Sequence, residues 1–239
     1  MKTFVVTGST KGIGLAIVEA LINKYQDVKI FMSYGHDAAS ADSCKKKWGN
    51  LVDVYQVDLG SYKEMQEYCA YIRKNTSTID GLVLNAGIGY KASLENLDIE
   101  EWERVMRVNV NVPIFMIKEL LPNLKAHSAI VMAGSIMGDI PHSGSLVYGV
   151  SKAAVHAAVK NLMKFLADRK IRINAIAPGF TESEWHKGKP QEFFDRIASK
   201  IAIQRWGRPE EVAQAYLFAL ENEFLNGSII SINGGYSYY

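Results

Sequence analysis

The sequence predicts an α/β protein, a single domain over residues 1–239 built on a Rossmann-type, doubly wound parallel sheet with helices on both faces. Three observations favour this class. Short apolar runs alternate with segments whose apolar residues recur at helical spacing, as in repeated βαβ units. A glycine-rich turn joins the first apolar run to the first helical segment, and no internal repeat or linker interrupts the alternation. Such a fold binds ligands beyond the carboxyl ends of its strands.

The strand candidates are short apolar runs of the kind that crossover helices cover on both faces of a parallel sheet. They lie at residues 4–6, 28–32, 51–57, 82–84, 129–133, 171–177 and 228–232.

The helix candidates lie between these runs, at residues 12–24, 62–74, 99–121, 148–168 and 210–221. The last one begins with Pro209 at a first-turn position, followed by two glutamates that suit the positive end of a helix. Residues 181–208 are the least patterned part of the chain. A long irregular segment late in an α/β domain is typical of a lid or of a surface excursion, and with catalytic residues nearby we expect a lid over a substrate site.

The composition excludes several classes of protein. The chain is 48% hydrophobic and 22% charged, which allows a substantial core, and its net charge of +2 gives no case for nucleic acid or an anionic membrane as partner. No apolar run is long enough to span a membrane, and six residues before the glycine turn leave no room for a signal peptide. Cys44 and Cys69 form no CxxC pair and the histidines show no ligand spacing, so we expect reduced thiols, no metal and a cytoplasmic location.

The glycine turn reads Thr-Gly-Ser-Thr-Lys-Gly-Ile-Gly over residues 7–14. It stands where the pyrophosphate of a dinucleotide meets the free N–H groups at the start of a helix, and small residues let the backbone approach the phosphates. The alternative is an ordinary strand-to-helix turn. The cofactor-binding candidates in it are Gly8, Ser9, Lys11, Gly12, Ile13 and Gly14.

Tyr148 and Lys152 stand four residues apart, on one face of an expected helix. Reduction of a carbonyl needs a proton at oxygen as hydride reaches carbon, and a nearby cation lowers the pKa of a phenol toward neutral pH. In isolation the pair fits equally a solvated lysine beside a half-buried tyrosine. Ser135, at the carboxyl end of an expected strand, favours the catalytic interpretation.

Together these motifs resemble the short-chain dehydrogenase/reductase family, and matching segments run in order from Thr3 to Gly235. The spacing T-G-x-x-x-G-x-G differs from the G-x-G-x-x-G of two-domain dehydrogenases. The run Arg-Pro-Glu-Glu-Val-Ala at residues 208–213 looks like that of 3-oxoacyl-thioester reductases, although it is widely shared.

The resemblance implies a catalytic tetrad. In it Ser135 hydrogen-bonds the substrate carbonyl, Tyr148 is the acid/base, and Lys152 tunes the tyrosine and binds the nicotinamide ribose. Asn109 matches the asparagine that holds a water on the proton path, although it could also satisfy a helix kink.

The resemblance also implies cofactor contacts after three strands. The matching positions are Asp58 and Leu59 near the adenine, Asn85, Ala86 and Gly87 along the adenine ribose, and Pro178, Gly179, Thr181 and Ser183 around the carboxamide. Thr181 and Ser183 depart from the aliphatic residue and the threonine that are more usual there.

The residues at the end of the second strand favour NADP(H), with NAD(H) possible. An NAD site carries an acid about 20 residues after the last glycine. Tyr34 stands at that position, and Lys11 resembles the basic residue that NADP-preferring members place against the 2′-phosphate. The usual following arginine is absent, because Gly35 stands there, and Asp37 could still reach the ribose.

The expected substrate is a small carbonyl or alcohol held among residues 136–147, Tyr90 and residues 181–206. Helices 99–121 and 148–168 are apolar around much of their circumference, more than one sheet face can cover, and the family resemblance implies that they pair in a homodimer or homotetramer. The aromatic tail, residues 236–239, is expected in an intersubunit contact or near the substrate mouth. The alternative function is a catalytically silent dinucleotide sensor or partner-binding protein, which the presence of both Tyr148 and Lys152 disfavours.

Overall fold

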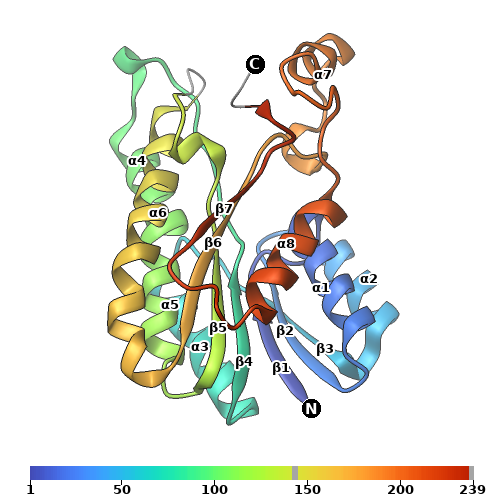
Figure 1. Cartoon of the computed structure of the whole chain (residues 1–239), viewed down its shortest axis with the longest axis vertical. Coiled ribbons are helices and arrows are strands. Elements are labelled where there is room, and N and C mark those ends of the chain that lie inside the picture. The colour runs from blue at the N-terminus through green and yellow to red at the C-terminus, as the bar shows by residue number, and fades with distance from the viewer. Residues whose placement is uncertain (142–144, 237–239) are drawn as a thin grey trace.

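The computed structural model describes residues 1–141 and 145–236, apart from the side chain of His186. Seven parallel strands form one sheet in the order β3-β2-β1-β4-β5-β6-β7 (Figure 1). They are β1 (Lys2–Val6), β2 (Val28–Tyr34), β3 (Val52–Gln56), β4 (Ile79–Leu84), β5 (Leu124–Ala133), β6 (Arg172–Pro178) and β7 (Ile229–Ile232). All seven expected strands are confirmed, and the largest change is at β5, which begins at Leu124 rather than residue 129.

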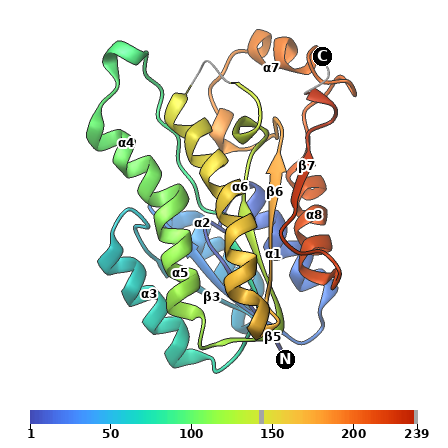
Figure 2. The ribbon, with the colours of Figure 1, turned by 60° about the vertical axis from the view of Figure 1, so that its left-hand side comes forward.

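Helices cover both faces of the sheet, as expected (Figures 1 and 2). One face carries α1 (Gly12–Lys24), α2 (Ala38–Trp48) and α8 (Pro209–Glu221). The other carries α3 (Tyr62–Asn75), α4 (Ile99–Met106), α5 (Val112–Leu120) and α6 (Leu146–Leu166). Every residue of β4 is buried between the two helical layers, so the core lies on both sides of the sheet.

The strand order reverses between β1 and β4. The chain first builds outward through β2 and β3, then returns to the other side of β1 and continues through β5, β6 and β7. In doubly wound sheets such a reversal opens a crevice at the carboxyl ends of the strands. That edge is the upper one in Figure 1, where α7 (Gln191–Ala198) also lies.

Two helices and one distortion were not expected from the sequence. The periodicity of α2 is weak because only Ala41 and Cys44 are buried, and α7 lies within the segment expected to be irregular. The expected helix over residues 99–121 is split by a π-helical turn, Arg107–Asn111, between α4 and α5. Short 3₁₀ turns occupy Gly49–Leu51, Leu94–Asn96, Ile136–Gly138, Ala167–Arg169 and Glu184–His186. Among the described residues, no helix combines the length and the apolar character needed to cross a membrane.

Candidate active site

The glycine turn forms a cradle at the start of α1. Gly8 has φ +59° and Gly12 has φ +51°, backbone conformations that favour glycine. A Cβ on Gly14 would overlap the carbonyl oxygen of Gly8, so only glycine fits there. No side chain caps the N-terminus of α1, which leaves its N–H groups facing the cradle.

Neighbouring strands hold this turn in place. Asn85 Nδ2 donates to the carbonyl oxygens of Thr7 and Gly8 at 3.2 and 3.0 Å, and the Ala86 N–H donates to Thr7 Oγ1 at 3.1 Å. The sequence therefore places Asn85 and Ala86 correctly beside the cradle. Ser9 is buried and accepts from the Ser33 N–H at 3.2 Å, so its hydroxyl ties the turn to β2.

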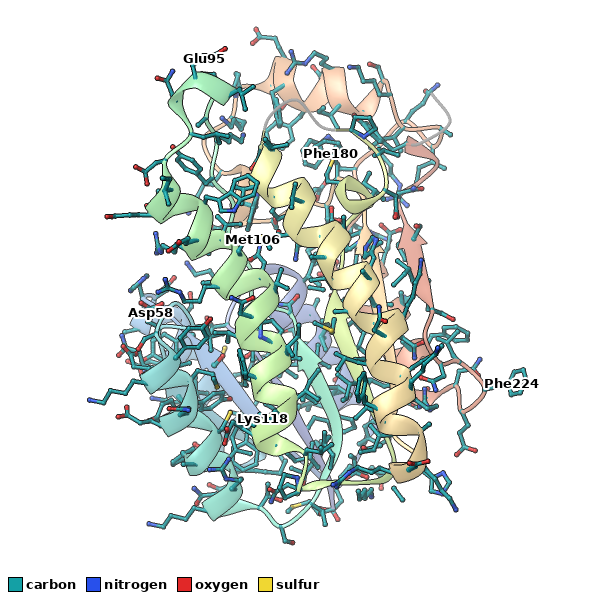
Figure 3. All side chains as sticks on the ribbon, turned by 90° about the vertical axis from the view of Figure 1, so that its left-hand side faces the viewer. Asp58, Glu95, Met106, Lys118, Phe180 and Phe224 are labelled. Carbon is teal, nitrogen blue, oxygen red and sulfur yellow. The ribbon has the colours of Figure 1, made fainter. Side chains whose placement is uncertain are left out.

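Three further predicted residues lie after β3 and in the glycine turn. Asp58 is exposed after β3, beside the start of α3, and its Oδ1 accepts from the Gly60 N–H at 2.8 Å (Figure 3). That bond makes Asp58 a turn residue as well as a candidate for adenine. Leu59 and Ile13 are half-buried against the two cores, with Leu59 on the α3 side and Ile13 on the α1 side. Both therefore shape the site through their backbone.

Lys11 forms an ion pair with Asp37. Asp37 caps α2, where its Oδ1 accepts from the Ser40 N–H at 3.0 Å, and the Lys11 ammonium together with this cap holds the pKa of the Asp37 carboxyl well below its usual range. Tyr34 is half-buried at the end of β2. The position expected for a 2′-phosphate therefore carries a lysine that already has an internal counter-charge.

Ser135, Tyr148 and Lys152 converge at the end of β5. Ser135 follows β5, and the other two lie in the first two turns of α6. Lys152 is buried, its Nζ donates to the Ala133 carbonyl at 2.7 Å, and it lies 5.4 Å from the centroid of the Tyr148 ring. The structure thus brings together the three residues that the sequence singles out.

Burial shifts the pKa of both ionisable groups in this cluster. Burial raises the pKa of Tyr148, and a hydrogen bond with Ser135 opposes that rise. Burial also lowers the pKa of Lys152 to about 8, because a charged ammonium is poorly solvated there. The hydrogen bond with Ser135 therefore favours the Tyr148 phenolate, and burial disfavours it.

Asn109 lies in the π-helical turn and faces this cluster. Its Oδ1 accepts from the Ile88 N–H at 2.9 Å, and its Nδ2 donates to the Ile88 carbonyl at 2.9 Å and to Ser151 Oγ at 3.0 Å. A Cβ on Gly87 would lie 3.3 Å from Asn109 Oδ1 and 3.5 Å from Lys152 Nζ. Asn109 therefore joins the segment after β4 to α6, the helix that carries Tyr148 and Lys152.

The segment after β6 passes over both the cradle and the tyrosine. Gly179 donates its N–H to the Ile232 carbonyl at 2.8 Å after Pro178 ends the strand, and Thr181 is buried with its Oγ1 donating to the Gly179 carbonyl at 3.2 Å. The Cβ of Ser183 lies 3.4 Å from where a Cβ on Gly12 would stand.

Trp185 lies in the same segment, two residues after Ser183, and contacts Tyr148. Its ring centroid is 5.7 Å from that of Tyr148, and its Cζ2 would lie 3.0 Å from a Cβ on Gly89. Only a residue as small as glycine at position 89 leaves room for this ring.

Comparisons with known proteins agree with this geometry. A family model described as Enoyl-(Acyl carrier protein) reductase matches residues 8–237. A solved short-chain dehydrogenase/reductase from Serratia marcescens superposes with a TM-score of 0.91 at 28% identity, over 99% of this chain and 98% of that one. This chain belongs to the short-chain dehydrogenase/reductase family.

Within the family the chain resembles the 3-oxoacyl-thioester reductase branch. It is 30% identical to 3-oxoacyl-[acyl-carrier-protein] reductase FabG of Thermotoga maritima, over 98% of this chain and 97% of that protein. It also matches the Pseudomonas aeruginosa RhlG/NADP active-site complex, with 29% identity, a TM-score of 0.89 and coverage of 98% of this chain and 96% of that one. As a family member, the protein is an NAD(P)-dependent oxidoreductase acting on CH–OH or C=O groups.

The family motifs left some contacts of the site unpredicted. Trp185 lies within the segment 181–208 that shows no pattern, and His156 is one of the histidines that lack metal-ligand spacing. In the structure His156 lies directly behind Ser135, one helical turn beyond Lys152, a spacing visible in the sequence. Over the described residues, no group of three or more His, Cys, Asp or Glu side chains could hold a metal ion.

The tail is described as far as Tyr236. Its ring centroid lies 5.0 Å from that of Phe180, which sits below α7 (Figure 3), in a cluster with Ile197, Ile201 and Trp206. The remaining tail residues, 237–239, lie outside the described part, as do residues 142–144 of the expected substrate-pocket lining.

Proposed function

We propose that this protein interconverts a small carbonyl compound and an alcohol with NADP(H), with Tyr148 as the acid/base. The observation that carries the proposal is the convergence of Ser135, Tyr148 and Lys152 beside an uncapped helix start in a glycine cradle. The bound cofactor supplies or accepts the hydride.

The cradle fits a dinucleotide because it offers N–H groups and no Cβ where a pyrophosphate would lie. From that anchor, Asp58 and Leu59 lie at the adenine end and Asn85, Ala86 and Gly87 along the middle. Pro178, Gly179, Thr181 and Ser183 lie at the nicotinamide end, and Lys152 and Tyr148 face the nicotinamide ribose.

Ser135 and Tyr148 handle the proton. The raised pKa of Tyr148 keeps the phenol protonated at neutral pH, so its O–H can donate to a substrate oxygen while the Ser135 hydroxyl orients that oxygen. The Lys152 ammonium stabilises the phenolate left behind. Asn109 supports the relay by fixing the Ile88 backbone beside Lys152.

The preference for NADP(H) rests on Lys11 and on the absence of an acid at Tyr34. The RhlG complex with NADP supports this assignment. If the purified enzyme oxidised NADH at least as efficiently as NADPH, the preference would be wrong.

The segment over residues 181–208 acts as the lid of a single-domain enzyme. Its Ser183 crosses Gly12 and its Trp185 faces Tyr148, so it covers both the cofactor cradle and the substrate position. Trp185 gives the substrate site an aromatic wall suited to a small apolar substituent on the carbonyl carbon.

We further propose a homodimer or homotetramer in a reducing cytoplasm. Phe115 of α5 and Val150 and Phe165 of α6 are 44%, 39% and 80% exposed, and these helices lie side by side on the outer face (Figure 2). Both cysteines are free and buried, which suits a reducing compartment. Sedimentation showing a monomer would contradict the assembly.

The test is a screen of ketones and alcohols with NADPH and NADP, followed through cofactor absorbance, in the wild type and in Tyr148→Phe. We expect the variant to lose turnover and to retain NADPH binding measured by calorimetry. Equal turnover in the variant would exclude Tyr148 as the acid/base. A silent dinucleotide sensor would instead bind NADPH with no turnover in either protein.

A further inference from the structure

His156 is a buried histidine that the proposed mechanism does not use. It lies on α6 one turn after Lys152, and its side chain is 5% exposed. Its Nδ1 is 3.0 Å from Oδ1 of Asp139, and its Nε2 accepts from the Ser135 N–H at 3.4 Å. The imidazole therefore connects a surface carboxylate to the backbone of the residue that would orient the substrate.

The two contacts select one form of the ring. An N–H donor such as that of Ser135 needs an unprotonated nitrogen, so Nε2 carries no proton. The neutral imidazole then carries its proton on Nδ1, where the Asp139 carboxylate accepts it. Asp139 thus sets the tautomer that lets His156 hold Ser135.

The turn around Ser135 is shaped to fit this ring. A Cβ on Gly134 would lie 2.5 Å from Nε2 of His156, and a Cβ on Gly138 would lie 2.9 Å from its Cε1. Any larger residue at either position would push the ring away. The glycine on each side of Ser135 therefore lets the turn close on the imidazole.

Two other hydrogen bonds hold the turn around Ser135, and neither of them uses the Ser135 N–H. The Gly134 N–H donates to the Ile176 carbonyl at 2.7 Å, which fixes the entry to the turn. Ser135 Oγ accepts from the Met137 N–H at 3.2 Å within the turn itself. The Ser135 backbone N–H reaches across to α6, the helix that carries Tyr148, through His156.

We propose that His156, held in its Nδ1–H tautomer by Asp139, is a positioning residue that fixes Ser135 relative to Tyr148. Its contribution to turnover rests on the proposed function, whereas its hold on the Ser135 amide does not. Loss of the ring should lower kcat and leave cofactor affinity intact, because its two hydrogen bonds go to Ser135 and Asp139, neither of which is a cofactor-binding candidate.

The kinetic test compares His156→Leu, which fills the space without an acceptor, with His156→Gln, whose amide oxygen can replace Nε2. We expect kcat to fall about tenfold in His156→Leu with KM for NADPH unchanged, and to recover in His156→Gln. In a Ser135→Ala background, His156→Leu should cause no further loss, since the ring acts through Ser135. Independent, additive losses would overturn the proposal.

A second set of measurements needs no turnover. In the wild type, side-chain ¹⁵N spectra should show one Nδ1–H histidine that is missing in His156→Gln, and the Ser135 amide should exchange faster in His156→Leu. Asp139 has a 55% exposed side chain, so Asp139→Ala should not impair folding. This variant should lose the Nδ1–H signal of His156, and its Ser135 amide should exchange faster than in the wild type. Unchanged tautomer and exchange would refute the positioning role, whereas absent turnover in the wild type would refute only the proposed function.

Discussion

Lys152→Met should stabilise the cofactor-free protein even though Lys152 is a candidate catalytic residue. Burial lowers the pKa of this lysine from 10.5 to about 8, so the folded state disfavours the ammonium by about 3 kcal/mol at 1.36 kcal/mol per pH unit. Methionine removes that cost and also removes the hydrogen bond to the Ala133 carbonyl, a loss of about 1 kcal/mol. The net gain is about 2 kcal/mol at pH 7, or roughly 4–8 °C in Tm for a chain of this size.

The gain should depend on pH in a defined direction. The folded pKa lies below the unfolded one, so the unfolded state binds more protons between about pH 8 and pH 10.5, and wild-type stability rises with pH across that window. The advantage of Lys152→Met should therefore be full below pH 8 and shrink above it. Urea denaturation at pH 7 and pH 9.5 measures both effects. Lys160→Met, an exposed lysine on the same helix, is the matched control and should change little at either pH.

A variant that is less stable than the wild type at pH 7, or whose difference from the wild type is constant with pH, would refute this reasoning. The first outcome would mean that the hydrogen bond to Ala133 outweighs the burial of the charge. The second would mean that the ammonium is solvated.

Three further predictions concern the lid, the cofactor and the core. Trp185→Ala removes the aromatic wall over Tyr148 and should raise KM for a small ketone several-fold with little change in Kd for NADPH; an unchanged KM would place the substrate elsewhere. Asp37→Asn keeps the α2 cap but releases Lys11, so calorimetry should show several-fold tighter NADPH binding that weakens with added salt, and equal Kd values would contradict this. The Tyr68 hydroxyl is buried without a hydrogen-bond partner among the described residues, so Tyr68→Phe should raise the free energy of unfolding by about 1–2 kcal/mol; destabilisation would reveal a partner.

The sequence predicts the sheet well because its central strands carry runs of apolar residues that helices cover on both faces. It misses α2 because that helix covers the edge strand β3 and buries only two small side chains, Ala41 and Cys44, too few for a periodic signal. The π-helical turn is also hidden, since its apolar spacing reads as one helix from residue 99 to residue 121.

At the site, the sequence predicts local motifs but does not predict contacts between segments that are far apart in the chain. Tyr148 and Lys152 are predictable because i,i+4 spacing places them on one helical face. The pairing of Lys11 with Asp37 depends on how α2 starts, and the contact of His156 with Ser135 depends on how α6 packs against the end of β5. Neither arrangement has a signature in the order of residues.

The π-helical turn at Arg107–Asn111 makes this enzyme sensitive to the loss of a single codon. A π-turn holds one residue more than the α-helical turn it replaces, so deleting one residue there would restore a regular helix. The π turn and the α-helical turn that replaces it each complete about one rotation, so α4 and α5 would keep their buried faces after the deletion. Only the residues of the turn itself would shift, and Asn109 would then lose its hydrogen bonds to Ile88 and Ser151.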